Sequence, residues 1–227
     1  MGRIHEPSGA AASADLVEAV RTRIGSTSRV AASLLFQGYA AHLFSPALAV
    51  AAEAGLVPDL SPARLWWRYI DGEPLHLLLA PARAHHALRE PVADLSVFAD
   101  AVHDTVVAQN LGPFIQQLRT TVSISPRVLW GNAASALAGA ARMLAPTPAG
   151  PAAHRLARQL IRYPDLAGTG RWDSAGAFRR TTCCLFYRVP GGGYCGDCVL
   201  AARSPRPASP AAARRNSSTT GPARSAP

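Results

Sequence analysis

All four cysteines of this 227-residue chain lie within sixteen residues near its C-terminal end. Cys183 and Cys184 are adjacent, and after ten further residues Cys195 and Cys198 form a C-x-x-C pair. Thiolates bind soft and borderline metal ions, and in a reducing cytosol clustered thiols are more often metal ligands or redox groups than disulfides. The spacing therefore predicts a metal or redox centre between Thr181 and Leu200.

Three interpretations of these thiols differ in the geometry that they require. Two disulfides are disfavoured because the cytosol is reducing and because a bridge between neighbouring cysteines closes a strained ring. A structural zinc ion takes four thiolates, but adjacent cysteines reach one small ion only if the chain bends sharply. A [2Fe–2S] cluster offers two irons that each take two thiolates, so neighbouring cysteines can serve it without converging on one point.

The loop between the two cysteine pairs, LFYRVPGGGY, places three glycines after Pro190. Proline turns the chain, and glycine lets backbone pass close to a cluster, where amide groups could donate to sulfur. A plain flexible turn explains the glycines equally well. The loop lacks the G-x-G-x-x-G spacing of a dinucleotide site.

Charge and hydropathy indicate which partners and which cellular location to expect for this protein. The formal net charge is +9, and every basic residue is arginine, but residues 201–227 hold five arginines and no acid. The remainder is only mildly basic, so no nucleic-acid partner is expected. The most apolar stretch, Ala31–Val57, is interrupted by polar residues and Pro46, and lacks the ~20 clean apolar residues of a membrane span. With no signal sequence visible, we expect a cytoplasmic protein without a membrane span.

The elements that must position the cysteines are mostly helical. Residues 1–12 are expected to be disordered, and apolar periodicity predicts a helical domain over residues 13–176. Ser45 as a cap, Pro46 in the first turn and Gly55 as a stop separate the third helix from the second. The predicted helices cover residues 13–25, 26–44, 45–55, 94–112, 112–122, 125–146 and 152–164.

Two regions interrupt the helical pattern. Two apolar runs flank Asp71–Gly72, which predicts a β-hairpin near residues 64–80. Residues 177–202 are extended and form the cluster-binding segment, and the Pro-, Ser-, Ala- and Arg-rich residues 203–227 are expected to be a disordered tail. The predicted fold class is mainly α with a small β-hairpin (α+β), followed by a C-terminal cysteine-rich cluster-binding segment.

The stretch CCLFYRVPGGGYCGDC closely resembles the C-terminal motif of the FhuF-like ferric-siderophore reductases, which arginines usually precede, as in RRTTCC here. A second patch, SPRVLWGNAAS at residues 125–135, is similar to an internal segment of that family. A looser helical resemblance covers roughly residues 28–200. One departure is Thr182, where many relatives pass directly from Arg-Thr to the first cysteine.

The resemblance implies that Cys183, Cys184, Cys195 and Cys198 hold a [2Fe–2S] cluster, with no catalytic residue beyond it. The implied activity is a ferric reductase, an oxidoreductase that adds one electron to the Fe(III) of a ferric siderophore. Hard oxygen ligands hold the resulting Fe(II) less tightly, so reduction releases the iron. No flavin or nicotinamide motif is present, so a separate electron-donor protein, ferredoxin-like or flavin-dependent, is the expected partner.

Three arginines flank the ligands: Arg179, Arg180 and Arg188. They are candidate substrate-binding residues because a basic rim attracts anionic chelates and offsets the charge of a thiolate cluster. A solvated basic strand explains them equally well. The competing hypothesis is a non-enzymatic helical protein, with a structural zinc site of four cysteine ligands and a basic tail for an acidic or nucleic-acid partner. A third is a degenerate siderophore-binding or synthesis-associated protein that keeps the fold and serves no redox step.

Overall fold

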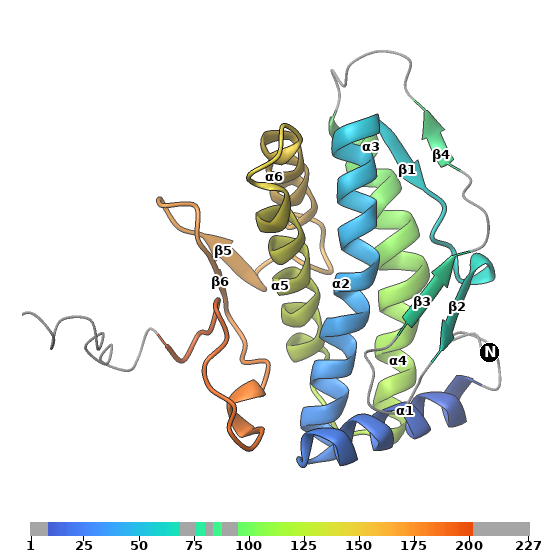
Figure 1. Ribbon diagram of the computed structural model, residues 1–227, viewed down its shortest axis with the longest axis vertical. Coiled ribbons are helices and arrows are strands. Elements are labelled where there is room, and N and C mark those ends of the chain that lie inside the picture. The colour runs from blue at the N-terminus through green and yellow to red at the C-terminus, as the bar shows by residue number, and fades with distance from the viewer. Residues whose placement is uncertain (1–8, 69–75, 80–83, 88–94, 202–227) are drawn as a thin grey trace, which may run out of the picture.

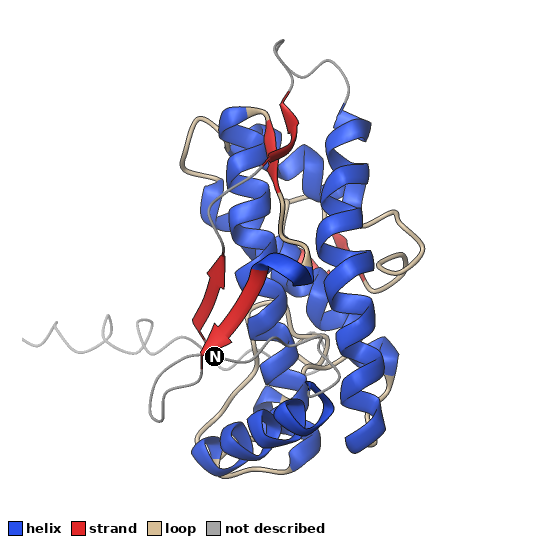
Figure 2. Ribbon diagram, turned by 90° about the vertical axis from the view of Figure 1, so that its right-hand side faces the viewer, coloured by secondary structure: helices blue, strands red, loops and turns tan. Residues whose placement is uncertain are grey.

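The longest helix, α2 (Ser28–Ala54), runs through the middle of the molecule (Figure 1). The computed structural model describes residues 9–68, 76–79, 84–87 and 95–201. Helices make up most of the described residues, which confirms the mainly α fold class (Figure 2). The other helical elements are α1 (Gly9–Ile24), η1 (Pro62–Arg64), α3 (Leu95–Val102), the π-helical η2 (His103–Leu111), α4 (Gly112–Thr121), α5 (Pro126–Leu144), α6 (Gly150–Leu160) and η3 (Phe186–Arg188).

Helix α2 is continuous, whereas the sequence pattern predicts two helices divided at Ser45. The Thr27 hydroxyl caps its start by accepting from the amide of Val30, and Gly55 ends it in the left-handed conformation. Pro46 lies inside the helix, where a proline costs about 3 kcal/mol. Large buried side chains on both sides of Pro46 each contribute about 1.5–3 kcal/mol, which outweighs that cost.

Helix α2 also bears on the expectation that no segment spans a membrane. It is 27 residues long and, by length and composition alone, apolar enough to cross a membrane. Half of the tested window is buried within the protein, and the core helix of a soluble protein passes the same test. The polar interruptions noted in the sequence therefore do not by themselves exclude a span.

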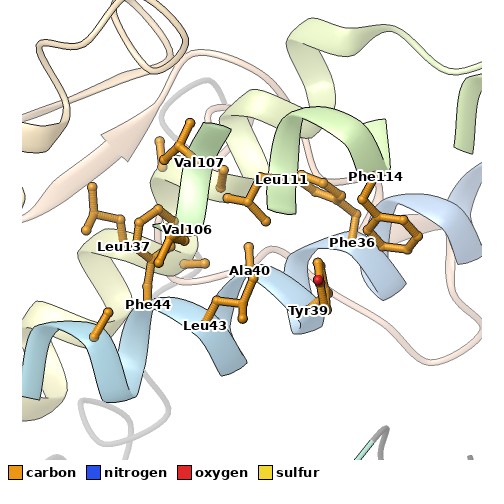
Figure 3. Close-up of a cluster of buried hydrophobic side chains, with 14 of the residues drawn as sticks. Phe36, Tyr39, Ala40, Leu43, Phe44, Val106, Val107, Leu111, Phe114 and Leu137 are labelled. Atoms are coloured by element: carbon orange, nitrogen blue, oxygen red, sulfur yellow. The ribbon is translucent and has the colours of Figure 1, made fainter. Parts of the chain in front are cut away.

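The core forms where α2 meets η2, α4 and α5 (Figure 3). The rings of Tyr39 and Phe114 pack edge to face with centroids 4.9 Å apart. The Tyr39 hydroxyl donates to Asn110 Oδ1 at 2.9 Å, and burial raises the pKa of Tyr39. The fully buried side chains around them are Phe36, Ala40, Leu43, Phe44, Val106, Val107, Leu111 and Leu137.

The predicted helices over 94–112 and 112–122 join into one helical run from Leu95 to Thr121. Helical backbone continues through Gly112, and the π-helical stretch η2 lies in the middle. The Asn110 side chain donates to the carbonyls of Thr105 at 2.6 Å and Leu60 at 2.8 Å. These bonds satisfy the polar amide inside the core.

Within the described residues, three two-stranded antiparallel sheets flank the helices. The predicted hairpin is confirmed by β2 (Leu65–Arg68) and β3 (His76–Leu79), although its Asp71–Gly72 turn lies outside the described residues. The sequence pattern does not predict the other two pairs. These are β1 (Leu56–Pro58) with β4 (Ala84–Ala87), and β5 (Gly170–Trp172) with β6 (Phe178–Arg180). The β5–β6 pair lies on the opposite side of the helices from the other two sheets (Figure 1).

The predicted boundaries differ most at the chain ends. Helix α1 begins at Gly9, inside the range 1–12 expected to be disordered. The predictions for residues 1–8 and for the tail, residues 203–227, fall outside the described residues. Helix α5 starts as predicted, with the Ser125 hydroxyl accepting from the amide of Arg127.

Candidate metal centre

The hairpin β5–β6 leads directly into the first cysteine pair. Its register pairs Arg171 with Arg179 and Trp172 with Phe178. Gly170 is required because a Cβ there would clash with the Phe178 ring. The sequence pattern predicts an extended chain from Ala177 but misses its partner strand, because three residues are too few to show alternation.

Helix α5 holds the chain between the hairpin and the cysteines. A Cβ on Gly131 would clash with the hydroxyl of Thr182, so glycine at this position lets the segment lie against the helix. The Thr182 hydroxyl also donates to the Arg127 carbonyl at 3.4 Å. At Gly131 the close neighbour of α5 is therefore the cysteine segment.

A sharp bend follows the adjacent cysteines. Leu185 has a φ of 69°, a left-handed conformation that is rare for a residue other than glycine. Its amide donates to Cys183 Sγ at 3.4 Å. The Ser33 hydroxyl of α2 donates to the Cys184 carbonyl at 2.8 Å, which fixes the pair to the helical body. Strained backbone of this kind often marks a functional site.

The C-x-x-C pair forms a tight turn beside the same hairpin. The Cys198 amide donates to the Cys195 carbonyl at 3.1 Å, and the Leu200 amide donates to Cys198 Sγ at 3.3 Å. The turn is tied to β6 because the Arg180 amide donates to the Asp197 carbonyl at 3.2 Å. Strand β6 therefore holds both cysteine pairs near each other.

The four thiols are free, and the structure brings the two pairs into contact. Cys184 and Cys198 are buried, while Cys183 and Cys195 are partly exposed. The sulfur atoms of Cys184 and Cys195 lie 3.5 Å apart. Their hydrogen bond is the main cause that lowers the pKa of Cys184 to about 6 and raises the pKa of Cys195. Burial is the main cause that raises the pKa of the Cys183 thiol.

The three consecutive glycines, Gly191, Gly192 and Gly193, lie in the turn between the two cysteine pairs. Gly191 has a φ of 72°, and a Cβ on Gly192 would clash with the carbonyls of Phe186 and Val189. The Gly192 amide donates to the Val189 carbonyl at 2.8 Å. The amides that donate to sulfur atoms of Cys183 and Cys198 belong to Leu185 and Leu200, each two residues after the cysteine that it contacts, and not to the glycines.

The three arginines predicted to bind substrate lie in different surroundings. Arg179 is exposed and donates to the Cys198 carbonyl at 3.3 Å. Arg188 is exposed in η3 and donates to the Tyr187 hydroxyl at 3.0 Å. Arg180 is only 2% exposed, so it cannot belong to an exposed basic rim. Substrate binding by Arg179 and Arg188 stays a prediction.

A cavity of about 500 Å³ lies beside Cys195, between α2, α5, the hairpin and the C-x-x-C turn. Trp172 and Phe178 form part of its wall, and Arg142 and Asp197 bring opposite charges to it. Gly139 on α5 also lines the cavity. A Cβ placed on this glycine would have no other atom within 4 Å, so there is open space beside it. The sequence pattern does not indicate this cavity, since its residues come from elements far apart in the sequence.

A second cavity of about 490 Å³ has a different lining. Arg171 and Arg179 face each other across the hairpin and both line it, together with Asp173, Arg180, Thr181 and Val199. Neither Arg179 nor Arg188 lines the cavity beside Cys195. None of the three arginines selected from the sequence lines the cavity beside Cys195.

The donor atoms at this site fit an iron–sulfur cluster. Four thiols are the ligands that a [2Fe–2S] core takes, and backbone amides that point at sulfur tune such centres. Amides of Leu185 and Leu200 already point at Cys183 and Cys198. Among the residues that the structure describes, no three His, Cys, Asp or Glu side chains are grouped to hold a single metal ion.

Two family models match the chain. One, described as ferric iron reductase FhuF-like transporter, covers residues 33–170, which is more than half of the sequence. The other, described as FhuF 2Fe-2S C-terminal domain, covers residues 180–200 and so includes all four cysteines. A search of curated proteins found no match. The second model identifies the cofactor as a [2Fe–2S] cluster, which favours the cluster over the zinc site considered from the sequence.

Proposed function

This chain belongs to the family of FhuF-like ferric iron reductases, and from that premise we propose that it reduces siderophore-bound Fe(III) by one electron. The donor protein loses one electron, the Fe(III) of the chelate becomes Fe(II), and the iron is released because oxygen ligands bind Fe(II) less tightly. The observation that carries the proposal is the thiol site at the edge of a cavity about 500 Å³ in volume.

We assign Cys183, Cys184, Cys195 and Cys198 as the ligands. When bound, a [2Fe–2S] cluster accepts and passes on one electron at a time. The partly exposed Cys195 supplies the ligand nearest to the cavity, since it lines the cavity wall. The buried Cys184 and Cys198 keep water away from the other side of the site.

We place the ferric chelate in the cavity beside Cys195. A volume of about 500 Å³ lies within the range of roughly 300–1,000 Å³ that small-molecule sites occupy. Trp172 and Phe178 offer an apolar wall, and Arg142 supplies a positive charge beside the C-x-x-C turn. A Cβ on Gly196 would lie 3.7 Å from Arg142 Nη1, so the guanidinium lies close to this turn.

The electron comes from a separate protein, ferredoxin-like or flavin-dependent, in this proposal. We also place the chain in the cytoplasm, where a reducing environment keeps the four thiols free for iron. Fractionation of cells that express the chain at natural levels tests this placement. Recovery in the membrane fraction, in line with the length of α2, would contradict it.

The activity is tested with the cluster-loaded protein under anaerobic conditions. The protein is reduced with dithionite, freed of excess reductant and mixed with a ferric tris-hydroxamate, while a chromogenic Fe(II) chelator reports the product. We expect about one Fe(II) for each electron held by the protein. Fe(II) formation no faster than with the Cys184→Ala protein would refute the proposed reaction.

The chelate site is tested by filling the cavity. Gly139→Leu adds a side chain into the cavity, while Gly38→Leu adds the same side chain at an exposed helical glycine that does not line it. We expect Gly139→Leu to keep its iron and to reduce the chelate about tenfold more slowly, since small misplacements are costly in rate. Equal rates for the two variants would remove the cavity from the proposal and leave the reductase assignment in place.

A further inference from the structure

Arg180 is the largest fully buried side chain among the described residues. Its Nη2 donates to Asn132 Oδ1, but Nε and Nη1 have no hydrogen-bond partner in the described part of the chain. No carboxylate forms an ion pair with it there. A buried charge without a counter-charge is costly, so the fold keeps this guanidinium inside at the expense of stability.

A chain of hydrogen bonds connects Arg180 to the first cysteine pair. Asn132 accepts from Arg180 and donates through Nδ2 to the Ser33 carbonyl at 2.7 Å and hydroxyl at 2.8 Å. The Ser33 hydroxyl in turn donates to the Cys184 carbonyl. Asn132 and Ser33 are fully buried, so α2 and α5 fix the guanidinium in place from within the core.

The backbone of Arg180 lies between the two cysteine pairs. Arg180 is three residues before Cys183, and its amide donates to the carbonyl of Asp197, inside the C-x-x-C turn. The unpaired cation is therefore next to the site that the thiols form.

We propose that Arg180 is the built-in counter-charge of the cluster, held by Asn132 so that it favours the reduced state. Two ferric ions, two sulfides and four thiolates sum to a dianion, and one added electron makes a trianion. The cation of Arg180 offsets more energy in the trianion than in the dianion, so it raises the reduction potential. Arg180 is thus a positioning and tuning residue and does not contact the chelate.

The competing explanation is that Arg180 only pins the hairpin to α5 through Asn132. A purely structural contact at this buried position would not need a charge, since a hydrogen-bonding neutral side chain or an apolar one would cost less. The two explanations differ in a property that can be measured without any siderophore. The test therefore does not depend on the proposed reaction, only on the bound cluster.

The experiment is an anaerobic redox titration of the cluster-loaded protein, followed by visible absorption and electron paramagnetic resonance. Arg180→Gln removes the charge, Arg180→Lys keeps it, and Asn132→Asp places a carboxylate against the guanidinium and cancels its charge. A unit charge about 10 Å from a redox centre at an effective dielectric of about 20 changes the reduction equilibrium by about tenfold. We expect Arg180→Gln and Asn132→Asp to lower the ratio of reduced to oxidised cluster about tenfold at a fixed solution potential.

One control keeps the positive charge at position 180, and another removes a positive charge from an exposed neighbouring position. Arg180→Lys should stay near wild type, and Arg179→Gln, at an exposed neighbour, should shift the ratio less and lose its effect as salt rises. If Arg180→Gln and Asn132→Asp fail to take up the cluster while Arg180→Lys loads normally, charge is still the property required. A shift in Arg180→Gln no larger than in Arg179→Gln would overturn the proposal. So would an Arg180→Lys protein as impaired as Arg180→Gln, because the charge would then be irrelevant.

Discussion

The helical body and the cysteine segment, residues 178–200, are stabilised in different ways. The body buries a continuous set of aliphatic and aromatic side chains along α2, α4 and α5. The segment buries only four side chains: Arg180, Cys184, Leu185 and Cys198. Three of its four aromatic residues, Phe186, Tyr187 and Tyr194, are exposed. The body can therefore fold by apolar burial alone, whereas the segment relies on hydrogen bonds to the body and on its cofactor.

The junction between the two regions is narrow. It includes Ser33 on α2 and the first turns of α5, where Gly131 and Asn132 meet Thr182 and Arg180. Phe178 packs against the core, and the hydrogen bonds through Ser33 and Asn132 add polar attachment to this apolar contact. Substitutions in the body, at the junction and in the segment should therefore separate folding from cluster binding.

The largest effect should come from the ligands. Cys183→Ala, Cys184→Ala, Cys195→Ala and Cys198→Ala each remove one of four thiolates and should abolish or strongly reduce bound iron and acid-labile sulfide. The helical signal in far-ultraviolet circular dichroism should persist, because the body does not depend on the cluster. Met143→Ala, at a residue 74% exposed, is the control and should bind two irons per chain, as a [2Fe–2S] site requires. A single cysteine variant with full iron and sulfide would remove that residue from the ligand set.

At the junction, Gly131→Val should release the segment from α5. The added side chain meets Thr182 and Arg180, so we expect most of the iron to be lost while the helical signal stays. Gly139→Ala is the matched control on the same helix, since a Cβ there has open space, and should keep its iron. Addition of Thr182→Ala to Gly131→Ala should restore binding relative to Gly131→Ala alone. A normal iron content in Gly131→Val would show that the segment does not need this contact.

In the body, Phe114→Ala should lower the stability of the fold and leave cluster binding intact, which is the opposite of what the ligand and junction variants should do. Removal of this fully buried ring from between Phe36 and Tyr39 should lower the free energy of unfolding by about 3–5 kcal/mol, measured by urea denaturation. Below its lowered melting temperature the variant should still bind a full cluster. Loss of iron in a variant that remains folded would mean that the two regions are more strongly coupled than the narrow junction suggests.

A smaller effect is expected at the start of α5. Ser125→Ala removes the hydroxyl that accepts from the Arg127 amide and should cost about 1 kcal/mol of unfolding free energy. The turn that it caps also carries the Arg127 carbonyl that accepts from Thr182. Iron content should therefore fall slightly before the body unfolds. Ser125→Asp, another good cap, should restore both properties, and failure to do so would assign the loss to something other than capping.

The smallest effect is predicted for the tail. Residues 203–227 show no apolar periodicity in the sequence, so truncation after Ala202 should leave iron content, melting temperature and the visible spectrum unchanged. A drop of several degrees in melting temperature, or loss of the cluster, would place the tail in contact with one of the two regions.

Local sequence patterns are sufficient to predict some of the helices and strands. The Asp71–Gly72 signal between apolar runs predicts the β2–β3 pairing, and Ser125 predicts the start of α5. Local rules mislead at Ser45 and Pro46, where burial of the neighbouring apolar side chains maintains one helix. They miss β5–β6 because strands of three residues have no recognisable period.

For the site, sequence by itself determined which atoms can bind the cofactor, because the type and spacing of the cysteines are local properties. Only the tertiary structure decided what surrounds them. Arg180 and Asn132 are 48 residues apart, and Ser33 and Cys184 are 151 residues apart, so no local pattern relates them. In the sequence Arg180 is one of several arginines that could form a solvated rim. Burial between α5 and the C-x-x-C turn distinguishes it from Arg179, since the energy of a charge depends on the groups and solvent around it.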